Sequence, residues 1–200
     1  MNYSEQAPRE HESLELIHKM ISSAKRDFED DSFHYLIWGW LVFLACATQF
    51  ILMQMNISYN YIGWMIFMPT GAIASMIYGY RQDKKQRVKS YTDEVMKYVL
   101  ISFLVALGTV LIFMPKLGLM TYPLVMLTYG TWLFTSGGMI KFRPLIIGGI
   151  LNWALGILSA FVTFEYQLMI LALAVLLGYI IPGYMLKNKF KLMQQNNSLS

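Results

Sequence analysis

The chain has 200 residues, of which 56% are hydrophobic and 14% are charged, and its formal net charge at pH 7 is +4. Soluble domains carry about 25% charged residues, so this chain has too few charges to cover a soluble protein of its size. Between Ser32 and Gln82 the sequence contains one basic residue, Arg81, and no acidic residue, which is typical of membrane-spanning segments.

Residues 1–31 are polar, and we interpret them as a cytoplasmic N-terminal segment with one amphipathic helix at about 13–29. Apolar residues recur there three or four positions apart and form one stripe. The stripe consists of Leu14, Ile17, Ile21, Ala24 and Phe28. Acidic residues outnumber basic ones around it, so docking on the protein's own cytoplasmic face, on a second subunit or on a partner protein is favoured over adsorption to anionic lipid.

Six apolar segments follow, and each is long enough to cross the ~30 Å hydrocarbon core of a bilayer as a helix. They are continuously apolar and do not alternate, which predicts helices and not a β-barrel. The sequence therefore predicts an all-α integral membrane protein. Its transmembrane domain, 32–186, contains helices at about 33–54, 58–80, 95–114, 119–140, 145–164 and 167–186, and a basic and polar tail follows at 187–200.

The connections "QMNIS", "PKLG" and "EYQ" are short, so the six helices form three hairpins. The openings of the first and fifth segments, "FHYLIWGWLV" and "FRPLIIGGIL", are similar. Two interpretations stay open. One is an old duplication of a helical hairpin, and the other is convergent use of aromatic and basic anchors at a membrane interface.

Every basic residue except Lys116 falls on one side of this topology. The positive-inside rule then predicts that both termini lie in the cytoplasm of a bacterium, at its inner membrane. The rule also explains the positive net charge without a nucleic-acid partner. A basic loop between the second and third segments completes the predicted docking surface, with Arg81, Lys84, Lys85 and Arg87.

Enzymatic chemistry is not expected. The interiors of the six predicted spans contain no Asp, Glu or Arg, and the three histidines lie on the cytoplasmic side. The single cysteine, Cys46, excludes an intramolecular disulfide and a cysteine-based metal cluster, and we expect it to pack as a small apolar residue. The sequence predicts no cofactor and no metal.

Neutral polar residues remain inside the spans. Thr128, Thr131 and Thr135 share one helical face, Gln49 lies deep in the first span, and Asn152 lies near the centre of the fifth. Such residues bond helices to each other in many membrane proteins, and this packing interpretation is favoured. The alternative is a path for a small solute lined by the same side chains.

Small residues four positions apart predict close helix packing, because they let helix backbones approach in lipid. In the second span they are Gly71, Ser75 and Gly79. In the fifth they are Gly148, Gly156 and Ala160, on the same stripe as Asn152.

At "ESLELIHKMI", "FRPLIIGGILNW", "FEYQLM" and "GYIIPGYMLK" the chain resembles a group of small bacterial multi-spanning membrane proteins with no assigned function. The resemblance covers most of the chain. It implies a helical inner-membrane protein of this size and carries no catalytic or binding residues.

The expected function is that of a non-enzymatic structural or regulatory membrane component. Its partners are the bilayer and, through the N-terminal helix, a second copy or another protein. The alternative is a carrier or channel for a small neutral, zwitterionic or lipid-like molecule. A carrier requires a polar cavity lined by Thr128, Thr131, Thr135 and Asn152, whereas a packing role places these side chains in helix contacts.

Overall fold

A computed structural model describes residues 32–83 and 91–198 of the chain. The predicted amphipathic helix with Leu14, Ile17, Ile21 and Phe28 lies outside the described residues. So do Lys84, Lys85 and Arg87 of the predicted docking loop.

Within the described ranges all regular structure is helical, in agreement with the predicted all-α class. A first helix occupies Ser32–Gln54. The other elements are α2 (Ile62–Asp83), α3 (Tyr91–Ile112), α4 (Met114–Leu117), the short helical turn η1 (Gly118–Met120), α5 (Thr121–Met139), α6 (Arg143–Ser159), α7 (Phe164–Val175), the π-turn η2 (Leu176–Ile180) and α8 (Ile181–Ser198).

Five helical stretches are long and apolar enough to cross a membrane. They are Ser32–Gln54, Ile62–Arg81, Glu94–Ile112, Met114–Met139 and Phe164–Lys189. The predicted fifth span, 145–164, corresponds to the shorter apolar helix α6, which has 17 residues. The last helix continues past the predicted end at 186, as α8 extends to Ser198.

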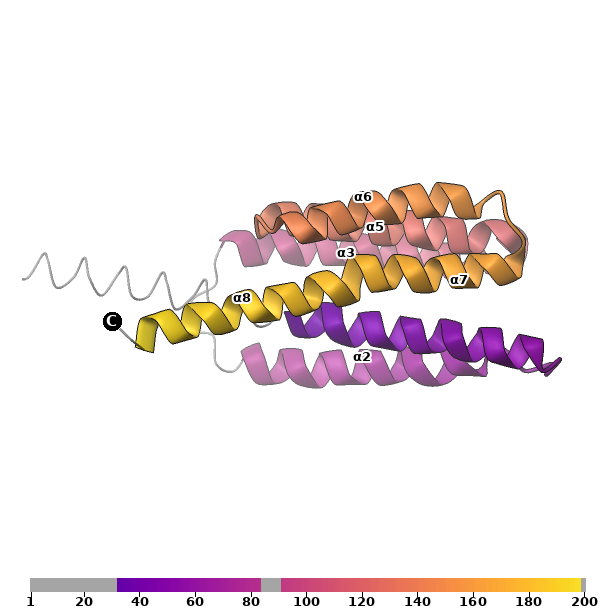
Figure 1. Ribbon diagram of the computed structural model, residues 1–200, viewed down its shortest axis with the longest axis horizontal. Coiled ribbons are helices and arrows are strands. Elements are labelled where there is room, and N and C mark those ends of the chain that lie inside the picture. Colours follow the sequence, from indigo (N-terminus) through magenta and orange to yellow (C-terminus); the bar gives the residue numbers. More distant parts are fainter. Residues whose placement is uncertain (1–31, 84–90, 199–200) are drawn as a thin grey trace, which may run out of the picture.

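The helices lie side by side in a bundle (Figure 1). The continuous helix of α7, η2 and α8 runs through the middle, with α3, α5 and α6 on one side of it and the first helix and α2 on the other. Gly39 of the first helix lies against Tyr179 and Ile180 of η2, and Gly71 of α2 lies against Leu41 of the first helix.

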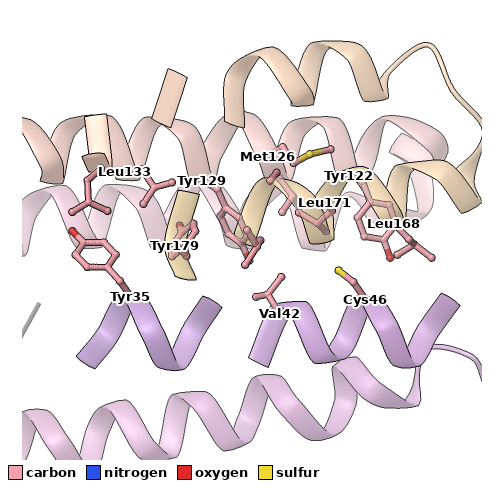
Figure 2. Close-up of a cluster of buried hydrophobic side chains, with 14 of the residues drawn as sticks. Tyr35, Val42, Cys46, Tyr122, Met126, Tyr129, Leu133, Leu168, Leu171 and Tyr179 are labelled. Atoms are coloured by element: carbon pink, nitrogen blue, oxygen red, sulfur yellow. The ribbon is translucent and has the colours of Figure 1, made fainter. Parts of the chain in front are cut away.

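The main apolar core lies where the first helix, α5 and the α7–η2 segment meet (Figure 2). Met126 and Leu133 of α5 and Leu171 of α7 are completely buried in it. Cys46 of the first helix is buried and carries a free thiol, which agrees with its predicted packing role.

The turn between α5 and α6 is tightly hydrogen-bonded. The Phe142 amide donates to the Gly137 carbonyl at 2.8 Å, and the Lys141 amide donates to the Gly138 carbonyl at 3.2 Å. These two bonds form a Schellman motif, whose left-handed position is taken here by Lys141 with φ 53°. Pro144 then lies in the first turn of α6, where its missing N–H is tolerated.

Adjacent glycines at the end of α5 offer a test of this packing. A Cβ at Gly137 would lie 2.8 Å from Leu145 Cβ and 2.9 Å from the Ile146 nitrogen, whereas a Cβ at Gly138 would meet nothing within 4 Å. We expect Gly137→Ala to lower the free energy of unfolding by about 1–3 kcal/mol through overpacking. Gly138→Ala should leave it unchanged or raise it by about 0.4–1 kcal/mol.

Both variants are measured by SDS-induced unfolding in detergent micelles, followed by circular dichroism. Equal effects of the two substitutions would contradict the close contact between α5 and α6.

Candidate functional site

Gln49 joins three helices. Its Oε1 accepts a hydrogen bond from Trp64 Nε1 of α2 at 2.6 Å and another from the Tyr122 hydroxyl of α5 at 2.8 Å. The side chain is 4% exposed, so both bonds lie away from solvent. An amide that connects helices in this way acts as a packing residue.

Asn152 joins α6 to α7. Its Nδ2 donates to the Ala174 carbonyl at 3.1 Å and to the Gly148 carbonyl of its own helix at 2.9 Å. The side chain is fully buried, and its Oδ1 has no hydrogen-bond partner among the described residues. A Cβ added at Gly178 would clash with Nδ2 and with Leu133, so a glycine suits that position.

The π-turn η2 forms at this contact. The Ile181 amide donates to the Leu176 carbonyl, five residues back. Pro182 has no N–H to offer to the Gly178 carbonyl, which is its acceptor in a regular α-helix. That carbonyl instead lies against Gly148, where an added Cβ would be 3.1 Å from the oxygen and 2.9 Å from Gly178 Cα. The widened turn and the two glycines therefore let the backbones of α6 and η2 meet.

Gln167 is a third buried amide, which the sequence analysis did not single out. Its Nε2 donates to the carbonyls of Ser159 at 3.0 Å and Val162 at 3.3 Å. Gln167 is fully buried, and its Oε1 has no hydrogen-bond partner in the described part of the chain. Because its position next to a loop suggested an exposed residue, only the fold reveals that it closes the α6–α7 turn.

The three threonines of α5 bond to their own helix. Thr128 donates to the Leu124 carbonyl at 2.8 Å, Thr131 to that of Leu127 at 3.0 Å, and Thr135 to that of Thr131 at 2.7 Å. Back-bonding of this kind satisfies a hydroxyl within one turn of helix.

The same threonines line a groove of about 580 Å³ between α3 and α5. Asn152 is not part of its lining and bonds to α7 instead. The structure therefore does not bring Thr128, Thr131, Thr135 and Asn152 into one cavity.

The predicted small-residue stripes differ in what they contact. Gly148 and Gly71 each lie against a neighbouring helix, and a Cβ at Gly156 would lie 3.2 Å from Met126 Cβ of α5. Ser75 accepts a hydrogen bond from Trp38 Nε1 at 3.1 Å. A Cβ at Gly79 would meet nothing within 4 Å. Ala160 forms the C-terminal cap of α6.

Two further glycines of α5 pack against α6 and were not predicted. A Cβ at Gly130 would be 2.8 Å from the Gly149 carbonyl and would also meet the Trp153 ring. Trp153 Nε1 donates to the Leu127 carbonyl at 3.2 Å. Gly130 and Gly137 are seven residues apart, and this heptad spacing is the sequence signal for the contact.

Charged side chains gather at the ends of the helices. Arg81, Lys97, Lys141, Arg143 and the lysines of α8 lie at the same end of the bundle, and Lys116 lies at the other. Lys189 Nζ is 5.6 Å from the centre of the Phe142 ring, which links α8 to the α5–α6 turn. The described residues contain no group of three or more His, Cys, Asp or Glu side chains able to hold a metal ion.

Comparison of the chain with protein-family models, with curated proteins and with solved structures finds no match.

The Gln49 contact is tested by a double-mutant cycle. Gln49→Leu leaves the Trp64 N–H and the Tyr122 hydroxyl without their acceptor, so we expect it to lower the free energy of unfolding by about 1–3 kcal/mol. Tyr122→Phe should have a smaller effect in the Gln49→Leu background than in the native protein. Strictly additive effects would show that the two side chains are not coupled.

Asn152 and Thr128 are expected to respond differently to loss of polarity. Asn152→Leu removes a bond between two helices and should lower stability by about 0.6–2 kcal/mol. Thr128→Val preserves shape and removes a bond within one helix, so its effect should stay within about 0.5 kcal/mol. Unfolding in detergent micelles measures both. A larger loss for Thr128→Val than for Asn152→Leu contradicts the packing role of Asn152.

Proposed function

We propose that this protein is a non-enzymatic, multi-pass protein of the bacterial cytoplasmic membrane that acts as a structural or regulatory membrane component. The observation that carries this proposal is the use of the buried amides. Gln49 and Asn152 each bond one helix to another, and Gln167 closes the turn between two helices. Polar side chains used in this way hold a bundle together.

A sixth crossing by α6 is part of the proposal. With 17 residues α6 is about 25 Å long, at the lower limit of what spans a hydrocarbon core. It lies along α5 and along the α7–η2 segment, both of which belong to longer apolar helices. Six crossings give the topology of three hairpins, with both termini on the same side.

The end of the bundle that carries most basic residues faces the cytoplasm in this proposal, as the positive-inside rule requires. Lys141 and Arg143 are exposed there, in the turn between α5 and α6, and Lys97 is exposed near the start of α3. Together with the predicted N-terminal helix and the basic loop, this end would dock a cytoplasmic partner or a second copy.

A carrier for a lipid-like molecule is the second candidate. The α3–α5 groove favours it, because its volume of about 580 Å³ falls in the range of small-molecule sites. The self-bonded hydroxyls of Thr128, Thr131 and Thr135 suit a largely apolar cargo.

Topology is tested by labelling single cysteines in intact cells with a membrane-impermeant maleimide, after Cys46→Ala removes the native thiol. We expect Lys116→Cys and Phe161→Cys to react from outside, because both lie at the end opposite the basic one. Lys141→Cys should react only after the membrane is permeabilised. Labelling of Phe161→Cys only after permeabilisation would exclude a crossing by α6.

The docking role is tested by placing a photoreactive amino acid at position 141 or at position 116 in cells. We expect a defined protein adduct at 141 and none at 116, and removal of residues 1–30 should abolish the adduct. Adducts that persist without residues 1–30 contradict docking through the N-terminal helix. Protein-dependent transfer of a fluorescent lipid between the leaflets of proteoliposomes would support the carrier instead.

A further inference from the structure

The groove between α3 and α5 has a regular lining. Six residues of α3 between Val95 and Ala106 and six of α5 between Leu124 and Thr135 face it, at spacings of three and four. Each wall therefore presents one continuous face of a helix. Both walls belong to helices that are long and apolar enough to cross a membrane.

The groove offers few hydrogen-bond donors to a ligand. The hydroxyl hydrogens of Thr128, Thr131 and Thr135 are already donated to backbone carbonyls of α5. Aliphatic and aromatic side chains, with Phe103 and Trp132 among them, make up most of the remaining lining. A hydrated solute would find replacement donors there only on Tyr98, Ser102 and Trp132, whereas a hydrocarbon chain has no hydrogen bonds to lose.

The length of the groove suits an acyl chain. Eleven residues separate Val95 from Ala106 and Leu124 from Thr135, so the groove is about 16 Å long at 1.5 Å per residue. This length is close to half of the ~30 Å hydrocarbon core, which is the depth of one leaflet.

The basic end of the bundle lies at one end of this groove. Val95 and Thr135 mark that end, and three exposed cations flank it: Lys97 in the same turn as Val95, and Lys141 and Arg143 in the turn after α5. Among the nearby residues whose side chains are described, Glu94 is acidic and these three are basic. Positive charge is therefore in excess among them. Such an excess at the depth of the headgroups attracts anionic lipid.

We propose that the α3–α5 groove binds an acyl chain of an anionic phospholipid, with the headgroup at the end that carries Lys97, Lys141 and Arg143. This inference rests on the membrane placement proposed above. It does not depend on the docking role of the N-terminal helix, nor does it require transport.

The test uses the full-length protein in phosphatidylcholine nanodiscs that contain a small fraction of phosphatidylglycerol with a photoreactive diazirine on one acyl chain. Peptide mass spectrometry locates the adducts. We expect them on residues 95–106 and 124–135. Ala106→Phe places a ring in the groove and should lower the adduct yield about tenfold, the loss expected when the acyl chain gives up roughly ten van der Waals contacts with the groove.

Val105→Phe is the matched control, because Val105 is exposed on the same helix and does not line the groove. It should leave the adduct yield unchanged. Equal yields for the two variants, or adducts spread over all exposed helices, would overturn the proposal. A photoreactive amino acid at position 102, in the groove, that crosslinked to a protein chain in place of lipid would also overturn the proposal and would identify a protein segment as the occupant.

The headgroup is tested by replacing phosphatidylglycerol with phosphatidylcholine that carries the same photoreactive chain. The native protein should prefer phosphatidylglycerol, and Lys141→Gln combined with Arg143→Gln should remove that preference, whereas Lys116→Gln at the opposite end should retain it. No preference in the native protein overturns the anionic part of the proposal. A protein released from nanodiscs by alkaline washing would refute the membrane placement itself, so the two failures are distinguishable.

Discussion

The adjacent glycines Gly148 and Gly149 let α6 approach two neighbours at once. Gly148 meets Gly178 of η2 on one side, and Gly149 meets the backbone of α5 at Gly130 and Phe134 on the other. In lipid the surrounding acyl chains are as apolar as the side chains, so close packing and hydrogen bonds have to hold helices together. The position of α6 against both α5 and the central helix follows from these two contacts, and the Asn152 bond to Ala174 adds a directional link.

The π-turn at η2 and the proline that follows it belong to the same arrangement. Pro182 has no N–H to donate to the Gly178 carbonyl four residues before it, and this carbonyl lies against Gly148, the residue type that can approach it most closely. Single π-turns within α-helices often occur at sites with a special role. Here the role is structural, since the turn brings the backbone of the last helix into contact with α6.

Much of the fold could be predicted from the sequence because apolar length is a local property. The first helix ends at Gln54, as predicted, and all elements within the described ranges are helical. The last apolar span was predicted at about 167–186 and is found at Phe164–Lys189, and the polar residues that follow it continue the helix to Ser198. The predicted fifth span ends at 164, whereas α6 ends at Ser159. The prediction was too long at this end because the turn "SAFVT" is largely apolar and resembles a continuing span.

The sites were less predictable, because a helical face can be read from the sequence but its neighbour cannot. Thr128, Thr131 and Thr135 share a face, as predicted, yet that face meets α3, whereas Asn152 meets α7. Gln49 was identified as polar and deep, but its partners Trp64 and Tyr122 lie on two other helices and are found only in the folded bundle. The unpredicted role of Gln167 has the same cause.

The contact between Gly39 and Tyr179 has a consequence for how the chain is made. The first helix leaves the ribosome long before the segment that covers it, since the residues at this contact lie near opposite ends of the sequence. In the membrane placement proposed above, the early hairpin of the first helix and α2 would therefore remain in the bilayer with its Gly39 face uncovered. The partner of this face arrives with the last helix, so the C-terminal segment completes the bundle.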